Sequence, residues 1–193
     1  DSMLSATGLI DMVNVRRHDH SDGMLTGSRV SVVPVSAPAH HHRAWREIRE
    51  MIASMELADG ARVCSIDIFS RLAEAEGRVH GKPADEVSFH EVGAWDSIAD
   101  IVVAGWLVDR LSPLTWSCSA LPTGSGEVRT AHGPLPVPTP ATALLLEGMP
   151  LVDDGVAGER ITPTGAAILA HLGPAFMGDA VVRRLAGTGT GFG

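Results

Sequence analysis

The sequence predicts an α/β or α+β fold in which a small mixed sheet packs against a layer of three or more helices. Three stretches between residues 43 and 111 carry apolar residues at helical spacing, which predicts three successive helices. After residue 110, short strand-like runs alternate with short helix signals, which is typical of mixed folds. The chain has 193 residues, 45% of them hydrophobic, and is therefore long enough to bury a sizeable core.

The first 39 residues differ in character from those that follow. Residues 1–15 are mixed and predict at most one helix, and the polar run 16–23 predicts a turn region. Residues 28–33 alternate and are rich in valine, which predicts a strand. Prolines then break the pattern, so 1–39 is predicted to be a strand-containing segment with a linker, and 40–193 the main α/β domain.

The first two helices are predicted from apolar residues three and four positions apart. One helix is expected over 43–56, with Gly60 as a stop signal after it. A second is expected over 62–77, ending at Gly77. His80 follows closely, and a favourable interaction between an imidazole and the helix C-terminus explains it structurally.

The third helix is predicted over 96–111 and is apolar on nearly every face, so it should be buried centrally. Asp96 or Ser97 is its expected N-cap, and Pro113 bars its continuation. Four prolines at alternate positions in 133–140 predict an extended, rigid connector. The other predicted elements are a core strand at 114–121, a short helix at 141–147, a strand at 149–152, a helix at 164–172 and a strand at 180–185.

Composition excludes several classes of partner. With 23 acidic and 15 basic residues the net charge is −8, and binding to nucleic acid is not expected because phosphate backbones select clustered Lys and Arg. No apolar run has the length of a membrane span, so no membrane partner is expected. Cys64 and Cys118 lie in apolar surroundings and are interpreted as free thiols, which favours a cytoplasmic location.

Three adjacent histidines at 40–42 form the first candidate metal site. Neutral imidazole is the commonest metal ligand among protein side chains. Alternate residues share a face of an extended segment, so His40 and His42 can bind one ion while His41 faces the opposite way. The alternative is a solvated polar run.

The second candidate site combines His90 and Glu91 with Asp96 and Asp100, all within eleven residues. The two aspartates are four residues apart and should share one face of the third helix. Mixed imidazole and carboxylate ligands suit nickel, manganese, zinc or iron. The alternative is that Asp96 caps the helix and Asp100 pairs with an arginine.

Two further segments are candidates for binding a phosphate. His132 lies in a loop rich in glycine and proline, and the nearby Ser125 and Gly126 have backbone amides that can face an anion. Thr162 and Thr164 open a predicted helix, and a helix N-terminus with hydroxyl groups is a favourable anion site. The alternatives are a plain turn and an ordinary cap.

These segments resemble one family, the LarC-type nickel-insertion proteins, which are pyridinium bisthiocarboxylate mononucleotide nickel chelatases. The resemblance runs in the family's order over about residues 23–193, and several of the motifs are long and unusual. The matching motifs are HHHR at 40–43, AEAEGRVHG at 73–81, FHEVGA at 89–94, DSI at 96–98, DI at 100–101, GSG at 124–126, AHG at 131–133, PVP at 136–138, PAT at 140–142 and TPTGAA at 162–167.

The resemblance implies a metal-insertion reaction on the precursor of the nickel-pincer cofactor of lactate racemase. A pyridinium mononucleotide with two thiocarboxylates receives nickel through two Ni–S bonds and one Ni–C bond. The residues expected to bind or relay nickel are His40, His42, His90, Asp96, Asp100 and His132. Glu91 or His132 is expected to accept the proton lost from carbon, and Ser125, Gly126, Thr162 and Thr164 to bind the phosphate.

The family also implies a second, C-terminal nucleotide-binding domain that uses CTP with manganese or magnesium. That domain is expected to be absent from these 193 residues. The expected partners are therefore a small nucleotide-like substrate and the C-terminal domain or a companion chain, with homo-oligomers left open. Residues 40–193 would then supply the nickel-handling and substrate-handling part.

Two other functions use the same residues differently. A divalent-metal hydrolase of phosphate esters would use the acidic centre to activate water. A nickel store or carrier would use the histidines only to bind metal, without recognising a nucleotide-like ligand.

Overall fold

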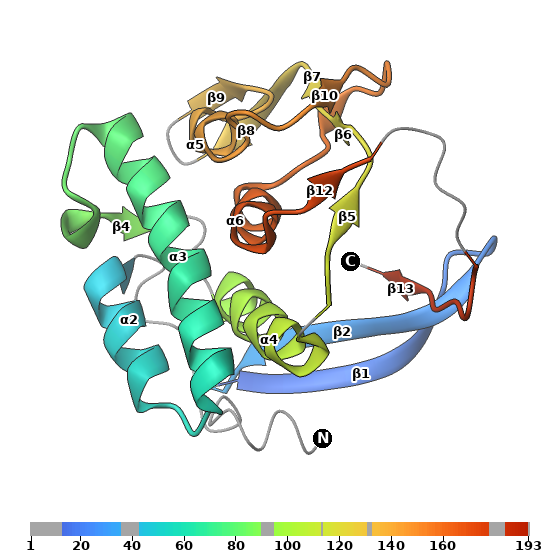
Figure 1. Ribbon diagram of the computed structural model, residues 1–193, viewed down its shortest axis with the longest axis horizontal. Helices are drawn as coiled ribbons and strands as arrows, with labels where there is room; N and C mark the ends of the chain where they lie inside the picture. The colour runs from blue at the N-terminus through green and yellow to red at the C-terminus, as the bar shows by residue number, and fades with distance from the viewer. Residues whose placement is uncertain are drawn as a thin grey trace.

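The computed structural model of the chain describes residues 13–35, 43–89, 95–112, 114–130, 133–177 and 184–192. It confirms the mixed α/β class, because helices and several small sheets alternate along the chain. The helices are α2 (Trp45–Ser54), α3 (Asp59–His80), α4 (Trp95–Leu111), α5 (Pro140–Leu145) and α6 (Pro163–Leu172), with a short 3-10 turn at Ala84–Glu86. The helices α2, α3 and α4 form the predicted layer, and α6 packs between α3 and α5 (Figure 1).

The strands are mostly short and pair in separate small sheets. They are β1 (Val13–Ser21), β2 (Thr26–Pro34), β3 (Arg43–Ala44), β4 (Ser88–Phe89), β5 (Ser117–Cys118), β6 (Leu121–Pro122), β7 (Gly124–Ser125), β8 (Glu127–Thr130), β9 (Gly133–Pro136), β10 (Leu151–Val152), β11 (Gly158–Glu159), β12 (Ala175–Phe176) and β13 (Gly191–Phe192). The predicted core strand at 114–121 is therefore two short strands, β5 and the start of β6. Of the strand predicted at 180–185, residues 180–183 lie outside the described residues, and 184–185 form no strand.

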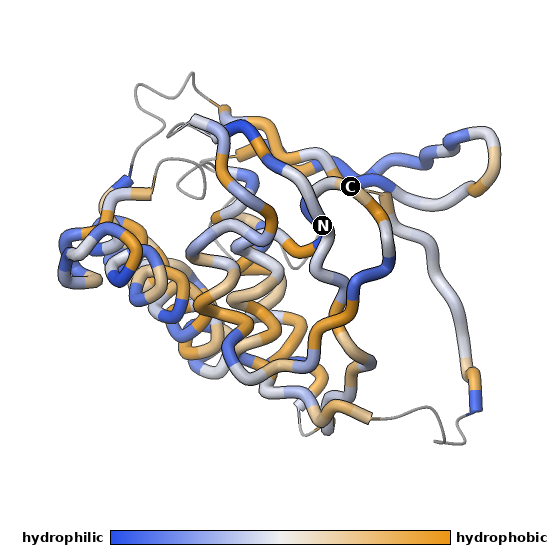
Figure 2. The backbone as a smooth tube through the Cα atoms, turned by 90° about the horizontal axis from the view of Figure 1, so that it is seen from above, coloured by the Kyte–Doolittle hydropathy of each residue, from blue (hydrophilic) through white to orange (hydrophobic). Residues whose placement is uncertain are grey.

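The longest strands, β1 and β2, form an antiparallel hairpin, and β13 adds to β2 in parallel. Figure 2 shows the distal end of this hairpin projecting from the helices, with mostly hydrophilic residues along it. The turn predicted at 16–23 is wrong, because most of that run belongs to β1. Both faces of the distal hairpin are solvated, so its polar residues do not show the alternation that marks a half-buried strand. The turn lies at Asp22, whose carboxylate accepts hydrogen bonds from the amides of Met24 and Leu25.

Helix α3 is longer than the sequence predicts at both ends. Gly60 is not a stop signal but part of its first turn, where a Cβ atom would collide with the carboxylate of Asp109 on α4. Gly77 does not end the helix. A Cβ atom there would lie 2.7 Å from the carbonyl oxygen of Lys82, so glycine lets the following turn fold back closely. The helix ends at His80 and is capped by Gly81, which adopts a left-handed conformation with φ 65°.

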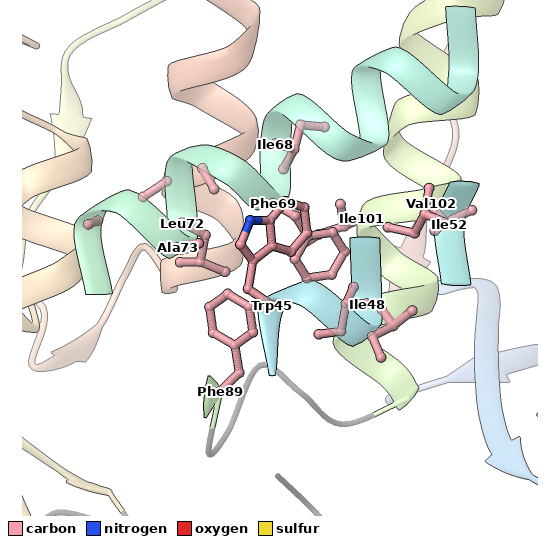
Figure 3. Packing of buried hydrophobic residues seen from close by; sticks show 14 of the residues in the cluster. Trp45, Ile48, Ile52, Ile68, Phe69, Leu72, Ala73, Phe89, Ile101 and Val102 are labelled. Carbon is pink, nitrogen blue, oxygen red and sulfur yellow. The ribbon is translucent and has the colours of Figure 1, made fainter. Parts of the chain in front are cut away.

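The core is centred on Phe69, which lies between two other aromatic rings. Its ring stacks on Trp45 of α2 at 5.8 Å and is 6.1 Å from Phe89 of β4, measured between ring centroids. Figure 3 shows aliphatic side chains from the three helices around these rings. They include Ile48, Ile52, Ile68, Leu72, Ile101 and Val102, all fully buried. The predicted amphipathic faces of the helices therefore meet as expected.

Helix α4 is confirmed almost to the residue, but two details of its prediction are wrong. It begins at Trp95, so Asp96 and Ser97 lie in its first turn and neither is the N-cap. It is also not buried on every face, since Ile98 and Ile101 are fully buried while Leu107 is 45% exposed. Figure 1 shows α4 crossing α3 on one side and the β1–β2 hairpin on the other.

The proline-rich stretch at 133–140 is not only a connector. Its first half is β9, which pairs antiparallel with β8 and places Pro134 and Pro136 opposite Arg129 and Glu127. A two-stranded hairpin has two edges, so these prolines need no partner for the amide they lack. The helices α5 and α6 confirm the predictions for 141–147 and 164–172 within two residues. No helix in the described part of the chain is long and apolar enough to span a membrane.

Candidate functional site

The short sheet β3–β4 joins residues that border two of the segments predicted to bind metal. Arg43, which follows the histidines at 40–42, pairs with Phe89, which precedes His90. The guanidinium of Arg43 also stacks 4.2 Å above the ring of Trp95, the first residue after 90–94. The described residues that border both histidine segments therefore meet at one place on the fold.

Next to this sheet is a cavity of about 240 Å³, here called the α3 cavity. It lies between the C-terminal half of α3, strand β4, the β8–β9 hairpin and the start of α5. Its apolar wall includes Val79, Phe89, Val128 and Leu135. Its polar lining is Glu76, His80, Ser88, Arg129, Thr130, Thr139 and Glu159. Phe89 and Thr130 come from different strands of the cavity wall and border the segments that contain His90 and His132.

His80 is a cavity-lining residue that the sequence analysis does not single out as one. It was explained by its place at the end of α3, and the structure does place it in the last helical turn. It also lines the α3 cavity, where its Nε2 atom is 3.4 Å from the Glu76 carboxylate one turn earlier. The spacing of four residues between a carboxylate and a histidine is the signal that predicts such a shared face.

A second hollow, here called the α4–α6 cleft, has a volume of about 580 Å³ and is more open. It lies between one face of α4 and the N-terminus of α6. Asp100 lines it together with Thr162 and Thr164, so the fold brings one predicted metal ligand next to two predicted phosphate-binding residues. Glu159 and Pro163 line both the cleft and the α3 cavity, which therefore share a wall.

The N-terminus of α6 has the cap that the sequence predicts. The hydroxyl of Thr162 accepts a hydrogen bond from the amide of Gly165 at 3.2 Å, and its carbonyl accepts one from Ala166. Pro163 occupies the first helical position and has no amide hydrogen. An anion in the cleft would therefore meet the hydroxyl groups of Thr162 and Thr164, the amide of Thr164 and the positive end of the helix dipole.

Asp100 differs from the prediction in its burial. It was expected within a buried helix, but it is exposed on the cleft side of α4. Partial desolvation by the surrounding protein raises the pKa of its carboxyl above the usual value, and the charge of Asp96, one turn earlier, raises it further. Asp96 itself accepts a hydrogen bond from the amide of Ser97 at 2.7 Å. Two carboxylates on one exposed face repel each other, and a bound cation would relieve that repulsion.

The remaining predicted site residues divide into two groups. His40, His42, His90, Glu91 and His132 lie outside the described residues. Ser125 pairs with Gly158 in the β7–β11 sheet, and the carbonyl of Gly126 accepts a hydrogen bond from Val137; neither lines the cavity or the cleft. Within the described ranges, no three histidine, cysteine or acidic side chains are grouped closely enough to hold a metal ion.

A hydrogen-bonded group fixes α6 against α3 and so supports the cleft. The Nδ1 atom of His171 on α6 is 2.7 Å from the Asp67 carboxylate on α3, and Arg71 donates to the same oxygen at 2.7 Å. Partial burial opposes the charge on Asp67, but the hydrogen bonds from His171 and Arg71 outweigh it and lower the pKa of the Asp67 carboxyl below 3.8.

We expect the hydrogen bonds to Asp67 to make a contribution to stability that is lost in acid. A carboxyl whose pKa is lower in the folded state stabilises the protein above its unfolded pKa, and the contribution is lost as the pH falls through the folded value. Between about pH 5 and pH 2.5 the thermal midpoint of the wild type should therefore fall more than that of Asp67→Asn. Calorimetry over this range tests the difference, with Glu74→Gln, an exposed position on the same helix, as the control. Parallel curves for Asp67→Asn and the wild type would contradict the assignment.

Comparison with known proteins identifies similar sequences. A family model described as nickel insertion protein matches residues 1–193. A nickel insertion protein of Geobacter sulfurreducens is 46% identical over 191 residues, which cover 95% of this chain and 49% of that protein. One from Syntrophobacter fumaroxidans is 46% identical over 173 residues, covering 89% and 43%. A pyridinium-3,5-bisthiocarboxylic acid mononucleotide nickel insertion protein of Nocardioides is 48% identical over 137 residues, covering 70% and 34%.

The chain spans about half the length of the curated relatives that it matches most fully. No solved structure matches it.

Proposed function

Because this chain belongs to the nickel insertion protein family, we propose that it handles nickel and substrate during insertion of the metal into pyridinium-3,5-bisthiocarboxylic acid mononucleotide. The product would be the nickel-pincer cofactor of lactate racemase. The proposal rests on one observation. The described residues that border the predicted histidine segments lie around one sheet and one cavity. Arg43 pairs with Phe89, and Phe89 and Thr130 line one cavity.

The chemistry of the proposed ligands suits a metal that must be released. Imidazole and carboxylate donors bind nickel less well than the softer sulfur atoms of the substrate, so the two thiocarboxylates can remove the ion from the protein. We propose His40, His42, His90, Asp96 and Asp100 as the ligands that hold nickel before transfer. Formation of the Ni–C bond releases a proton from the ring carbon, and we propose Glu91 or His132 as its acceptor.

We propose that the α6 N-terminus binds the phosphate of the mononucleotide. Thr162 and Thr164 present hydroxyl groups at the positive end of a helix, in the same cleft as Asp100. The carboxylates of Asp100 and Glu159 would repel a free phosphate, but a nickel ion between them and the phosphate would convert that repulsion into attraction. Ser125 and Gly126 remain a further proposed contact to the phosphate.

The relatives are about twice as long as this chain, and their other half has a proposed role as well. We propose that CTP with manganese or magnesium is used by a part of the protein that lies beyond the matched half, within the same chain, in a companion chain or in another copy. The overall reaction would be that of a CTP-dependent metal-inserting lyase in the cytoplasm. The test is mass spectrometry of the substrate after incubation with Ni²⁺. The mass of the nickel-containing product should appear only when CTP and the longer protein are both present.

Asp100→Asn is expected to weaken Ni²⁺ binding to this chain at least about tenfold, because it removes a ligand charge from the cleft. Calorimetric titration with Ni²⁺ measures this directly. Glu50→Gln is the matched control, since it removes the same charge from an exposed position on α2. The wild-type affinity should also fall as the pH is lowered towards the raised pKa of Asp100, because protons then compete with the metal.

Equal Ni²⁺ affinity in the wild type, Asp100→Asn and His90→Ala would rule out the proposed centre.

Mass spectrometry of the mononucleotide after incubation with the protein and Ni²⁺ separates the rival functions. Loss of phosphate from the mononucleotide without nickel uptake would replace the proposed function with phosphate-ester hydrolysis.

A further inference from the structure

Strand β1 forms an open edge of the sheet β1–β2–β13. The strand order places β2 in the centre and β1 on the outer side (Figure 1). Strand β1 is nine residues long, contains no proline, and has exposed side chains at most of its positions. Among the described residues, no other strand pairs with its outer side. The backbone amides and carbonyls along such an edge are a template for a further strand.

The side chains of β1 carry charges of opposite sign two positions apart. Arg17 and Asp19 lie on the same face of the sheet, because alternate residues of a strand point to the same side. Both are exposed. The β1–β2 ladder places Arg17 opposite Val30 and Asp19 opposite Ser28, so neither has an opposite charge directly across the hairpin. A second copy of β1, running antiparallel to the first, would supply both charges.

We propose that two copies of this chain pair through β1, antiparallel, about a two-fold axis at His18. A two-fold axis perpendicular to a sheet relates a strand to its copy, so one residue lies opposite its own counterpart. With His18 at the axis, Arg17 of each copy lies opposite Asp19 of the partner subunit. Two ion pairs therefore flank the axis, and the two three-stranded sheets become one sheet of six strands.

The charges on β1 select this register over its neighbours. If the axis passed through Arg17 or through Asp19, that residue would lie directly opposite the same charge in the other copy. Like charges at directly opposite positions destabilise a strand pair, whereas opposite charges stabilise it. Charged side chains commonly protect an edge strand from unselective pairing. On β1 their order permits the symmetric register at His18 and disfavours the two registers beside it.

The same register brings the exposed tip of each hairpin to the partner subunit. Met24 is 92% exposed and Leu25 is 57% exposed at this tip. Gly23 and Val13 are equally far from His18 in the sequence, so the tip of one hairpin lies beside the Val13 end of the other. Val13 is buried against the core of its own copy. The apolar side chains of each tip therefore exchange contact with water for contact with protein.

Asp19→Arg tests the ion pairs by placing like charges opposite each other. We expect the dissociation constant of the dimer, measured by sedimentation equilibrium of the 193-residue chain, to rise at least about tenfold. Arg17→Asp should weaken the dimer similarly, although it also removes the hydrogen bond from Arg17 to Ser28. Arg46→Asp makes the same charge change as Arg17→Asp at an exposed position on α2, and as the control it should leave the dissociation constant unchanged.

Mixing the two variants separates a specific ion pair from a general effect of charge. Asp19→Arg and Arg17→Asp chains should each dimerise poorly alone but should pair with one another, because their charges are then complementary at both positions. The double variant Arg17→Asp with Asp19→Arg should recover the wild-type dissociation constant.

Three outcomes would overturn the inference. They are a wild type that stays monomeric up to about 1 mM, an Asp19→Arg chain that dimerises as the wild type does, and a mixture of the single variants that stays monomeric. The measurement involves neither nickel nor the mononucleotide, so its result is independent of the proposed function.

Discussion

Phe69→Ala is expected to lower the free energy of unfolding by about 3–5 kcal/mol, the range for deleting a buried phenylalanine. Phe69 is fully buried between Trp45 and Phe89, so its loss removes the contact that joins α2, α3 and β4. Urea denaturation measures the change. Val63→Ala on the same helix, at a position 65% exposed, should change stability by less than about 0.5 kcal/mol. A similar small effect of Phe69→Ala would show that this cluster is not the centre of the core.

Gly105→Ala is expected to lower the free energy of unfolding by about 1–3 kcal/mol through overpacking. A Cβ atom at Gly105 would collide with the hydroxyl of Ser65 and lie 2.8 Å from the Ser65 amide nitrogen and 3.1 Å from the Ala61 carbonyl oxygen. Two of these atoms belong to the backbone of α3, so α4 has to move away. In an unhindered helix the same change would be stabilising by about 1 kcal/mol.

The displacement of α4 also predicts a functional effect. Asp100 is on the same helix, so Gly105→Ala should weaken Ni²⁺ binding as well as stability. Gly165→Ala in α6 is the control for stability, since a Cβ atom there would make only ordinary contacts, at 3.4 Å and 3.9 Å. If Gly105→Ala is as stable as the wild type, helices α3 and α4 do not pack as closely as described.

The sequence predicts the helical layer well because its signals are local. The apolar spacing locates α2 and α4 within a few residues, and the Thr162 cap of α6 follows from a single side chain and its neighbours. The glycines of α3 mislead because each makes room for a close backbone or side-chain contact rather than ending the helix. Gly60 accommodates Asp109, and Gly77 accommodates the turn at Lys82. Neither contact is visible in the local pattern.

The candidate site is only partly predictable for the same reason. The nearness of Asp96 to Asp100 follows from helical spacing, and after partial desolvation it is the second cause that raises the pKa of Asp100. The presence of Asp100 and Thr162 in one cleft depends on the packing of α4 near α6, which no motif encodes.

The pairing of β13 with β2 has a consequence for the order of folding. Gly191 and Phe192 lie beside Ser28 and Arg29, although almost the whole described chain separates them in sequence. Closing so large a loop costs entropy that two residue pairs cannot offset until the intervening helices have condensed. The helical layer, whose contacts are far more local, is therefore expected to assemble first, with this parallel ladder among the last native contacts to form.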